Sequence, residues 1–534
     1  MRFEVKTQKK RGLEMNKAIW LATTAIVAAA FLAAPASAGR SKQDQRDSEI
    51  QELKARLEKL EQESNAAKQQ TEDERIATGA RLAKVEQTQD AVQWTFADGR
   101  PTVRSGDGRF EMSIRGRVQL DWASFMQDNN DFGLGYGPAG NCDSTNALCD
   151  LGSGAVFRRV RFGVEGRFFK DFVYEIRFDF GGSDVEGGGV INIARVGYVG
   201  IPGLRIQAGA MQPIFTMYDS TSSAELTTME RAAVVTAVVG PFGGDNSRRG
   251  VEITYQKENL LWDGDNFLIS GAVTGSRTTN LNGGTSGSHS GGPDDEGTQI
   301  LGRTAMRLWS DGESNVQIGA SAAKTLSLQG VAPGGARNLQ FRERPEIRVT
   351  GERFIDTGAL NSNGAELFGF EFGANFKNLY VAAEYYNWTV DRVGATKDPE
   401  FSGYYVEGEW IFTGENKRYV ASGTNNNIAV FRGPSVASPW SLGGGIGAWS
   451  LSGRYSVLDL NAYEADAVVA NRVRGGEQTV TNIGLNWYLN TNLKLMTEYS
   501  MVDIERSSTA APVAPNNLLD ASFEVVQGRM QFTF

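Results

Sequence analysis

Long segments of this sequence alternate between apolar and charged residues with a period of two. From Asp171 to Phe180, aromatic residues and isoleucine stand at the even positions, and mostly charged residues stand at the odd positions. A period of two is that of a β-strand, whose successive side chains point to opposite faces of the sheet. Phe110 to Trp122 and Val156 to Phe168 repeat the pattern, so each of these strands is expected to have one apolar and one charged face.

Such strands could build either a water-soluble sandwich or a membrane protein. Each segment is long enough to cross a bilayer when tilted, which takes about 9–11 residues. Short turns alternate with long loops rich in Gly, Ser, Asn and Asp, and the chain ends in phenylalanine. The combination is typical of a transmembrane β-barrel with a polar lumen. Glycine supplies 63 of 534 residues without a G-X-Y period, which favours a sheet and excludes collagen.

Sixteen strands are predicted, so the expected fold is an all-β, 16-stranded antiparallel transmembrane barrel. An even number brings both ends of the barrel chain to the same side of the membrane. A further alternating segment, Arg344 to Phe354, would make the number odd, and it is therefore assigned to a loop. The predicted strands span residues 110–122, 156–168, 171–180, 190–199, 204–211, 248–256, 266–277, 298–309, 314–326, 366–376, 378–390, 401–412, 446–457, 477–489, 492–504 and 521–534.

Two long connections are expected to differ from ordinary surface loops. The loop 213–245 contains small apolar residues from Ala232 to Val239, which suit packing inside a barrel better than contact with water. It is therefore predicted to fold inward. The connection Gly414 to Gly445 falls on the side of the short turns, expected to be periplasmic, although it is long. Either it folds into the pore or the strand count is wrong there.

The N-terminal part is predicted to be a secretion signal followed by a helix. An apolar run, Ala18 to Ala34, precedes Ala36-Ser37-Ala38, so residues 1–38 are expected to be a signal peptide, with Met15 as an alternative start. An uncleaved membrane anchor is the other interpretation. Residues 39–93 are expected to form a periplasmic helical or coiled-coil segment, and residues 94–534 the barrel. Apolar residues at heptad positions a and d support the coil, and a single solvated helix is the alternative; these are Ile50, Leu53, Leu57 and Leu60.

Composition excludes several functions. The chain has a single histidine, His289, which rules out chemistry that needs a pair of histidines and rules out a His-rich metal site. No Ser-His-Asp triad or other catalytic constellation is found. We therefore expect no enzyme activity, no metal and no cofactor. A net charge of -9 argues against nucleic-acid binding. Cys142 and Cys149 are spaced to close a small loop, so a disulfide is expected in an oxidising compartment, with two free thiols as the alternative.

Arginines recur on the charged, lumen-facing side of three successive strands. Guanidinium groups can replace the hydration of an anion with fixed donors that match phosphate or carboxylate oxygens. A basic wall is one interpretation. The other is that these arginines pair with Glu111, Glu165, Glu175 and Asp179 and only balance charge. The candidate pore residues are Arg115, Arg117, Arg159, Arg161, Arg167 and Arg177, together with Arg231 on the inward loop, where Glu225 and Glu230 indicate mixed selectivity.

The order and spacing of several motifs resemble the phosphate-selective porin O/P family from Trp94 to Phe534. The resemblance implies a homotrimer of 16-stranded barrels in the outer membrane of a Gram-negative bacterium, with inward-folded loops and pore arginines. It also matches Arg158 and Arg159 to the paired arginines of the family, so a β-bulge that turns Arg158 inward is expected. The motifs are Arg115-Gly116-Arg117, Phe157 to Gly166, Gly403-Tyr404-Tyr405-Val406, Thr413-Gly414-Glu415, Gly447 to Ser456 and Asn482 to Tyr488.

The expected function is passive diffusion of small anions, phosphate-like or carboxylate solutes, through an arginine-lined pore. The alternatives are a weakly selective general-diffusion porin and an envelope tether that acts through the coiled coil. Expected partners are other copies of the chain, outer-membrane lipid and lipopolysaccharide, and the barrel-assembly machinery. We expect that machinery to recognise terminal aromatic residues, here Phe532 and Phe534.

Overall fold

The computed structural model describes residues 41–90, 92–97, 99–127, 151–182, 190–278, 297–328, 337–507 and 521–534. The expected signal peptide and both cysteines, Cys142 and Cys149, lie outside these residues. The chain divides near Thr88 into two compact units, which are a long helix and a β-barrel.

The first unit is the helix α2, Ser41–Asp90. Its sequence lacks proline and is rich in good helix formers, which accounts for its length. The apolar residues at the predicted a and d positions are exposed in the single chain, with 50% of Ile50 and 64% of Leu60 accessible. The coiled coil therefore stays a prediction. Among the described residues, no helix combines the length and the apolar composition needed to cross a bilayer.

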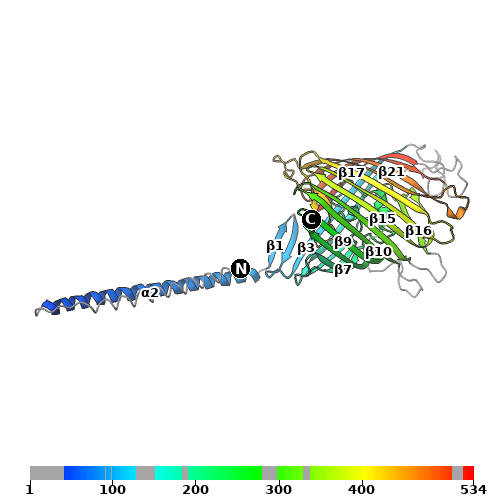
Figure 1. Cartoon of the computed structure of the whole chain (residues 1–534). Coiled ribbons are helices and arrows are strands. Elements are labelled where there is room, and N and C mark those ends of the chain that lie inside the picture. Colours follow the sequence, from blue (N-terminus) through cyan, green and yellow to red (C-terminus); the bar gives the residue numbers. More distant parts are fainter. Residues whose placement is uncertain are drawn as a thin grey trace. The chain divides into compact units, whose positions relative to one another are not determined.

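The second unit is a closed antiparallel barrel (Figure 1). Each strand pairs with the next along the chain, and β23 pairs with β3 to close the ring. All sixteen predicted strands are confirmed. They are β3 (Glu111–Met126), β4 (Gly154–Phe168), β5 (Phe172–Asp179), β6 (Val190–Tyr198), β7 (Leu204–Met211), β8 (Arg248–Glu258), β9 (Asn266–Arg277), β10 (Thr298–Ser310), β11 (Asn315–Ser327), β15 (Leu360–Phe376), β16 (Leu379–Arg392), β17 (Glu400–Ile411), β20 (Ala448–Ala462), β21 (Val473–Tyr488), β22 (Leu493–Glu505) and β23 (Ala521–Thr533).

Side chains alternate across the barrel wall as the period of two predicts. Apolar residues such as Phe162 and Phe370 point outward and are at least half exposed, whereas polar residues such as Gln119 point inward and are buried. An apolar outer surface with a polar interior suits a wall surrounded by lipid, because each side chain then meets a matching environment.

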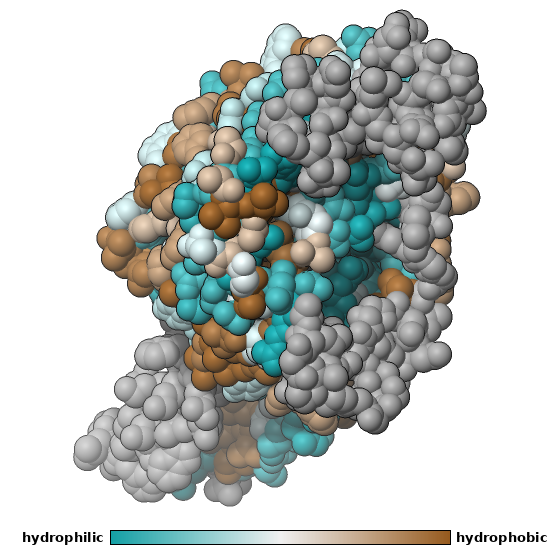
Figure 2. Space-filling view, turned by 90° about the vertical axis from the view of Figure 1, so that its right-hand side faces the viewer, coloured by the Kyte–Doolittle hydropathy of each residue, from teal (hydrophilic) through white to brown (hydrophobic). Residues whose placement is uncertain are grey.

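The two ends of the barrel differ. At the short-turn end, connections such as 169–171, 199–203 and 489–492 join neighbouring strands, and the chain both enters β3 and ends there (Figure 1). The other end, called here the long-loop end, carries the longer connections. Figure 2 views the long-loop end, where hydrophilic residues line a hollow.

A short hairpin adds two further strands to the sheet at the short-turn end. It consists of β1 (Gln93–Ala97) and β2 (Arg100–Arg104), and β2 pairs with the first residues of β3. Gly99 in its turn has a φ of 71°, and a Cβ atom there would lie 2.8 Å from the Asn492 side chain. A glycine therefore suits both the backbone conformation and the close packing against the barrel rim.

Three connections fold into the lumen. The inward loop 212–247 contains α3 (Met217–Ser220) and α4 (Ala233–Val239), and most residues of these two helices are buried. Residues 337–359 carry the short strands β12 (Asn338–Leu339), β13 (Arg342–Glu343) and β14 (Ile355–Asp356), so Arg344 to Phe354 is not a barrel strand. The connection 412–447 contains β18 (Lys417–Val420) and β19 (Val430–Pro434), and Lys417 and Ala429 in it are buried. The strand count is therefore right there, and this long connection enters the barrel.

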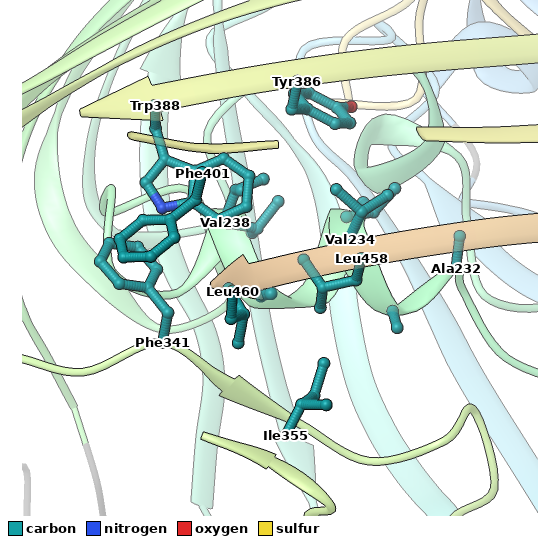
Figure 3. Close-up of a cluster of buried hydrophobic side chains, with 14 of the residues drawn as sticks. Ala232, Val234, Val238, Phe341, Ile355, Tyr386, Trp388, Phe401, Leu458 and Leu460 are labelled. Atoms are coloured by element: carbon teal, nitrogen blue, oxygen red, sulfur yellow. The ribbon is translucent and has the colours of Figure 1, made fainter. Parts of the chain in front are cut away.

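An apolar cluster fixes the inward loop near the long-loop end. Val234 and Val238 of α4 are fully buried and pack with inward-facing residues of the wall (Figure 3). The Trp388 ring centre lies 5.6 Å from that of Phe341 and 5.8 Å from that of Phe401. Phe341 belongs to the connection 337–359, so burial of the cluster stabilises the positions of both inward segments against the wall.

Candidate pore constriction

Carboxylates of the barrel wall hold the backbone of the inward loop. Three loop N–H groups donate to glutamates of three different wall strands, and a fourth donates to a glutamate of the inward connection 337–359, so the anchors are spaced around the lumen. Because these carboxylates are buried, a hydrogen bond to each supplies a partner that water cannot provide there. The bonds run from Ile214 to Glu252 (2.8 Å), from Met217 to Glu384 (2.9 Å), from Met229 to Glu498 (3.1 Å) and from Ala233 to the loop residue Glu346 (2.8 Å); the first three acceptors belong to the wall and the last to the inward connection 337–359.

The loop residue Glu230 collects four arginines, a set called here the Glu230 cluster. Its carboxylate lies 3.0 Å from Arg158, 3.2 Å from Arg159, 2.5 Å from Arg529 and 3.8 Å from Arg348. Burial alone would raise the pKa of the Glu230 carboxyl, but the charges of the four arginines hold this pKa well below its usual value.

A β-bulge brings Arg158 into that cluster. Gln119 pairs with Arg159, and the next residue, Leu120, pairs with Phe157, so Arg158 is the extra residue of β4. The bulge lets two adjacent arginines point to the same side of the sheet, which regular alternation forbids. Arg158 therefore faces the lumen, as the resemblance implied, and both arginines bind Glu230 instead of lining the open cavities described next.

Two adjoining cavities, called here the arginine chamber, open from the short-turn end into the lumen. Their volumes are about 180 and 40 Å³, and they share four wall residues. Among the described residues, eight arginine and two glutamate side chains line the chamber. These arginines are Arg100, Arg115, Arg117, Arg161, Arg177, Arg231, Arg418 and Arg432, and the glutamates are Glu175 and Glu225.

Part of this positive charge is balanced locally. Arg115 lies 2.6 Å from Glu165, Arg161 lies 2.6 Å from Asp179, and Arg177 lies 3.3 Å from Glu175. Such pairs fix the guanidinium planes and reduce the net field at the same time. The charge-balancing interpretation thus describes three of the predicted wall arginines. Arg167 is exposed on β4 and lies outside the chamber.

Arg117 is different. Its guanidinium donates to the hydroxyls of Ser222 (2.7 Å) and Ser223 (2.5 Å) on the inward loop. In the described part of the chain, no carboxylate lies within ion-pair distance of it. Arg117 lines both cavities of the chamber, so its charge faces them without a paired carboxylate among the described residues.

Arg231 lines the smaller cavity, but its donors are largely used within the loop. They bond to the carbonyl oxygens of Tyr218 (3.0 Å), Asp219 (3.1 Å) and Thr221 (2.6 Å). The Asp219 carboxylate lies 3.6 Å away. Arg231 therefore ties the two halves of the inward loop together as well as facing the cavity.

Sequence reasoning missed three chamber arginines. Arg100 comes from β2 and pairs with Glu165 at 2.9 Å, while Arg418 and Arg432 come from the inward part of the connection 412–447. None of them belongs to a barrel strand, so strand alternation could not assign them to the lumen. The length of this connection on the short-turn side was the available signal.

The first and last strands meet at a polar seam that also touches the inward loop. Arg529 of β23 stands opposite Asp121 of β3 and binds its carboxylate at 2.6 Å, in addition to binding Glu230. At the end of the chain, Phe532 faces outward and is 44% exposed. The Phe534 amide donates to Gly116 at 3.1 Å, and its ring centre lies 5.7 Å from that of Phe532.

Comparisons with known proteins found curated relatives, similar solved structures and a matching family. The chain is 22% identical to porin O of Pseudomonas aeruginosa over 81% of its length and 90% of that protein, and 26% identical to an uncharacterized protein of Caulobacter vibrioides over 82% of its length and 76% of that protein. Similar solved structures include the outer membrane channel DcaP of Acinetobacter baumannii (13% identity, 80% and 97% of the two chains, TM-score 0.42) and a loop L8 deletion mutant of OmpT of Vibrio cholerae (9% identity, 80% and 100%, TM-score 0.45). Residues 135–534 match the family described as "Phosphate-selective porin O and P", and the chain, an outer-membrane porin, belongs to this family.

Proposed function

We propose that this porin lets small anions, phosphate-like or carboxylate solutes, diffuse passively through the arginine chamber. The observation that carries the proposal is Arg117, a lumen cation without a carboxylate partner in the described chain that lines both cavities. A charge about 8 Å from a passing ion contributes about 2 kcal/mol at an effective dielectric constant of about 20. Such a term is large enough to favour anions over cations several-fold.

The orientation of the barrel, the role of the N-terminal segments and the oligomeric state are proposed from the sequence. The short-turn end faces the periplasm, as in other single-chain outer-membrane barrels. Residues 1–38 are a signal peptide, residues 39–93 are a periplasmic segment that associates as a coiled coil, and three barrels assemble into a homotrimer.

Reversal potentials in a KCl gradient across a planar bilayer test the selectivity. Arg117→Gln keeps a polar side chain for Ser222 and Ser223 but removes the charge. The reversal potential should therefore move toward the value of a cation-selective pore, and phosphate should block the current less. Arg104→Gln is the matched control, because Arg104 lies outside the chamber and pairs with Glu111. Equal selectivity of the parent and both variants would refute the proposal.

A weakly selective pore is the second candidate. It is favoured by the local ion pairs of Arg115, Arg161 and Arg177 and by Glu225 in the chamber lining. The two candidates separate in the same experiment, since a weakly selective pore conducts with a reversal potential close to zero before any substitution is made. A tether acting through the helix predicts normal conduction after residues 41–90 are removed, but loss of envelope integrity.

A further inference from the structure

The hairpin β1–β2 has two chemically different faces. Directly opposite residues of paired antiparallel strands share a face, so Trp94, Val103 and Met112 lie on the same side, and Thr95, Thr102 and Ser113 on the other. Met112 belongs to the outward surface of β3, whereas Ser113 is buried toward the lumen. The hairpin therefore presents Trp94, Phe96, Pro101 and Val103 outward, a set called here the apolar face.

The apolar face is unusually open for such large side chains. Trp94 is 67% exposed and Phe96 is 68% exposed, and no described residue covers them. The face continues the lipid-facing surface of the barrel past the start of β3, where Met112 is 41% exposed. Tryptophan and phenylalanine at this depth are typical of the aromatic belts that lie at the membrane–water interface.

The free edge of the hairpin sets its depth. β1 pairs with β2 alone among the described strands, so the backbone groups on its outer edge need water. Hydrocarbon cannot supply that water, whereas the headgroup region can. The opposite face carries Thr95, Thr102 and Arg100, and Arg100, which lines the chamber, pairs with Glu165.

We propose that the apolar face is a lipid-contact surface seated in the headgroup region of the leaflet at the short-turn end. The hairpin is then part of the membrane-embedded wall and not of the helical segment that precedes it. Its occupant is phospholipid, because the face is continuous with the lipid-facing surface of β3. The proposal adds a membrane contact outside the sixteen barrel strands, and it does not depend on the ion selectivity of the pore.

Fluorescence quenching tests the contact in the full-length protein. In a background with Cys142→Ser and Cys149→Ser, an environment-sensitive dye is attached at Val103→Cys on the apolar face or, as the matched position, at Thr95→Cys on the opposite face. The assembled protein is placed in phospholipid vesicles that carry a nitroxide close to the headgroup. The dye at position 103 should lose fluorescence, and the dye at position 95 should lose much less.

Two further measurements keep the test decisive. Adding Trp94→Ser and Phe96→Ser to the protein labelled at position 103 should remove the quenching while heat-modifiability shows that the barrel is still folded. Equal quenching at positions 95 and 103, or none at 103, would overturn the proposal. A disulfide between the cysteines of two chains at position 103, formed without lipid quenching, would overturn it in favour of a second copy of the chain.

Discussion

Arg529 of the last strand and Glu230 of the inward loop form an ion pair of 2.5 Å although they stand 299 positions apart. Removing one partner of a buried ion pair costs about 3–5 kcal/mol, because the other charge is left buried without compensation. Glu230→Gln should therefore loosen the inward loop and lower the thermal unfolding temperature of the barrel. The matched control is Glu111→Gln, which removes a carboxylate from a partly exposed pair.

The same pair predicts a pH dependence. The folded pKa of Glu230 is lowered, so its contribution to stability is full above the unfolded pKa of about 4.3 and is lost only as the pH falls through the lower folded value. The difference in unfolding free energy between the parent and Glu230→Gln should thus be the same at neutral pH and at a pH just above the pKa of an ordinary glutamate. It should become smaller as the pH falls below that pKa. Melting curves over this range measure it, and a difference that vanishes by mildly acidic pH contradicts the prediction.

Glu225 is the carboxylate whose removal should strengthen anion preference. It lines the larger cavity and accepts the Gly433 amide at 2.9 Å, a bond that a glutamine oxygen can also accept. Glu225→Gln should shift the reversal potential toward the value of an anion-selective pore, in the direction opposite to Arg117→Gln. The ratio of anion to cation permeability should change several-fold, as for Arg117→Gln. A shift in the same direction for both variants would show that the changes act through pore shape and not through charge.

The terminal aromatic residue is expected to matter for assembly. Phe534→Ala should lower the heat-modifiable fraction of the protein in the outer membrane, because we expect the assembly machinery to recognise the aromatic end of the C-terminal strand. Phe376→Ala removes an outward phenyl group from the short-turn end of another strand and is the control. Equal fractions for both variants would count against a role specific to the C-terminus.

The exposed leucines of α2 are expected to be buried in the assembled protein. Changing Leu53, Leu57 and Leu60 to Ser should lower the melting temperature of the proposed trimer, since each buried leucine contributes about 1.5–3 kcal/mol. Gln51, Glu52 and Lys59 changed to Ser alter the same helix at positions outside the a and d seam. If both triple variants melt like the parent, the contacts between barrels suffice for association.

Loss of the lipid contact of the β1–β2 hairpin should change the ion selectivity of the pore. Trp94→Ser with Phe96→Ser should displace Arg100 from the chamber and shift the reversal potential in the direction of Arg100→Gln. Leu261→Ser with Trp262→Ser is the control, because these residues form an exposed apolar pair in another turn at the same end. An unchanged potential would mean that Arg100 keeps its place without the lipid contact.

The strands could be predicted because lipid outside and polar groups inside impose a period of two on every wall segment. The same regularity could not reveal the bulge, since Arg158 differs from Arg159 only through the pairing with β3. Nor could it show that Trp388, at a lumen position, packs against the inward segments. Which arginine meets Glu230 and which meets the chamber depends on the path of the inward loop, and that path is set by contacts between residues far apart in sequence.

The polar seam links two events in the making of the barrel. Arg529 belongs to the last strand of the chain, yet it binds Asp121 of the first strand and Glu230 of the inward loop together. A ring that closed with the loop outside would keep the Arg529–Asp121 pair but lose the ion pair between Arg529 and Glu230. The free energy of ring closure is therefore coupled to that of loop insertion, because one guanidinium belongs to both contacts.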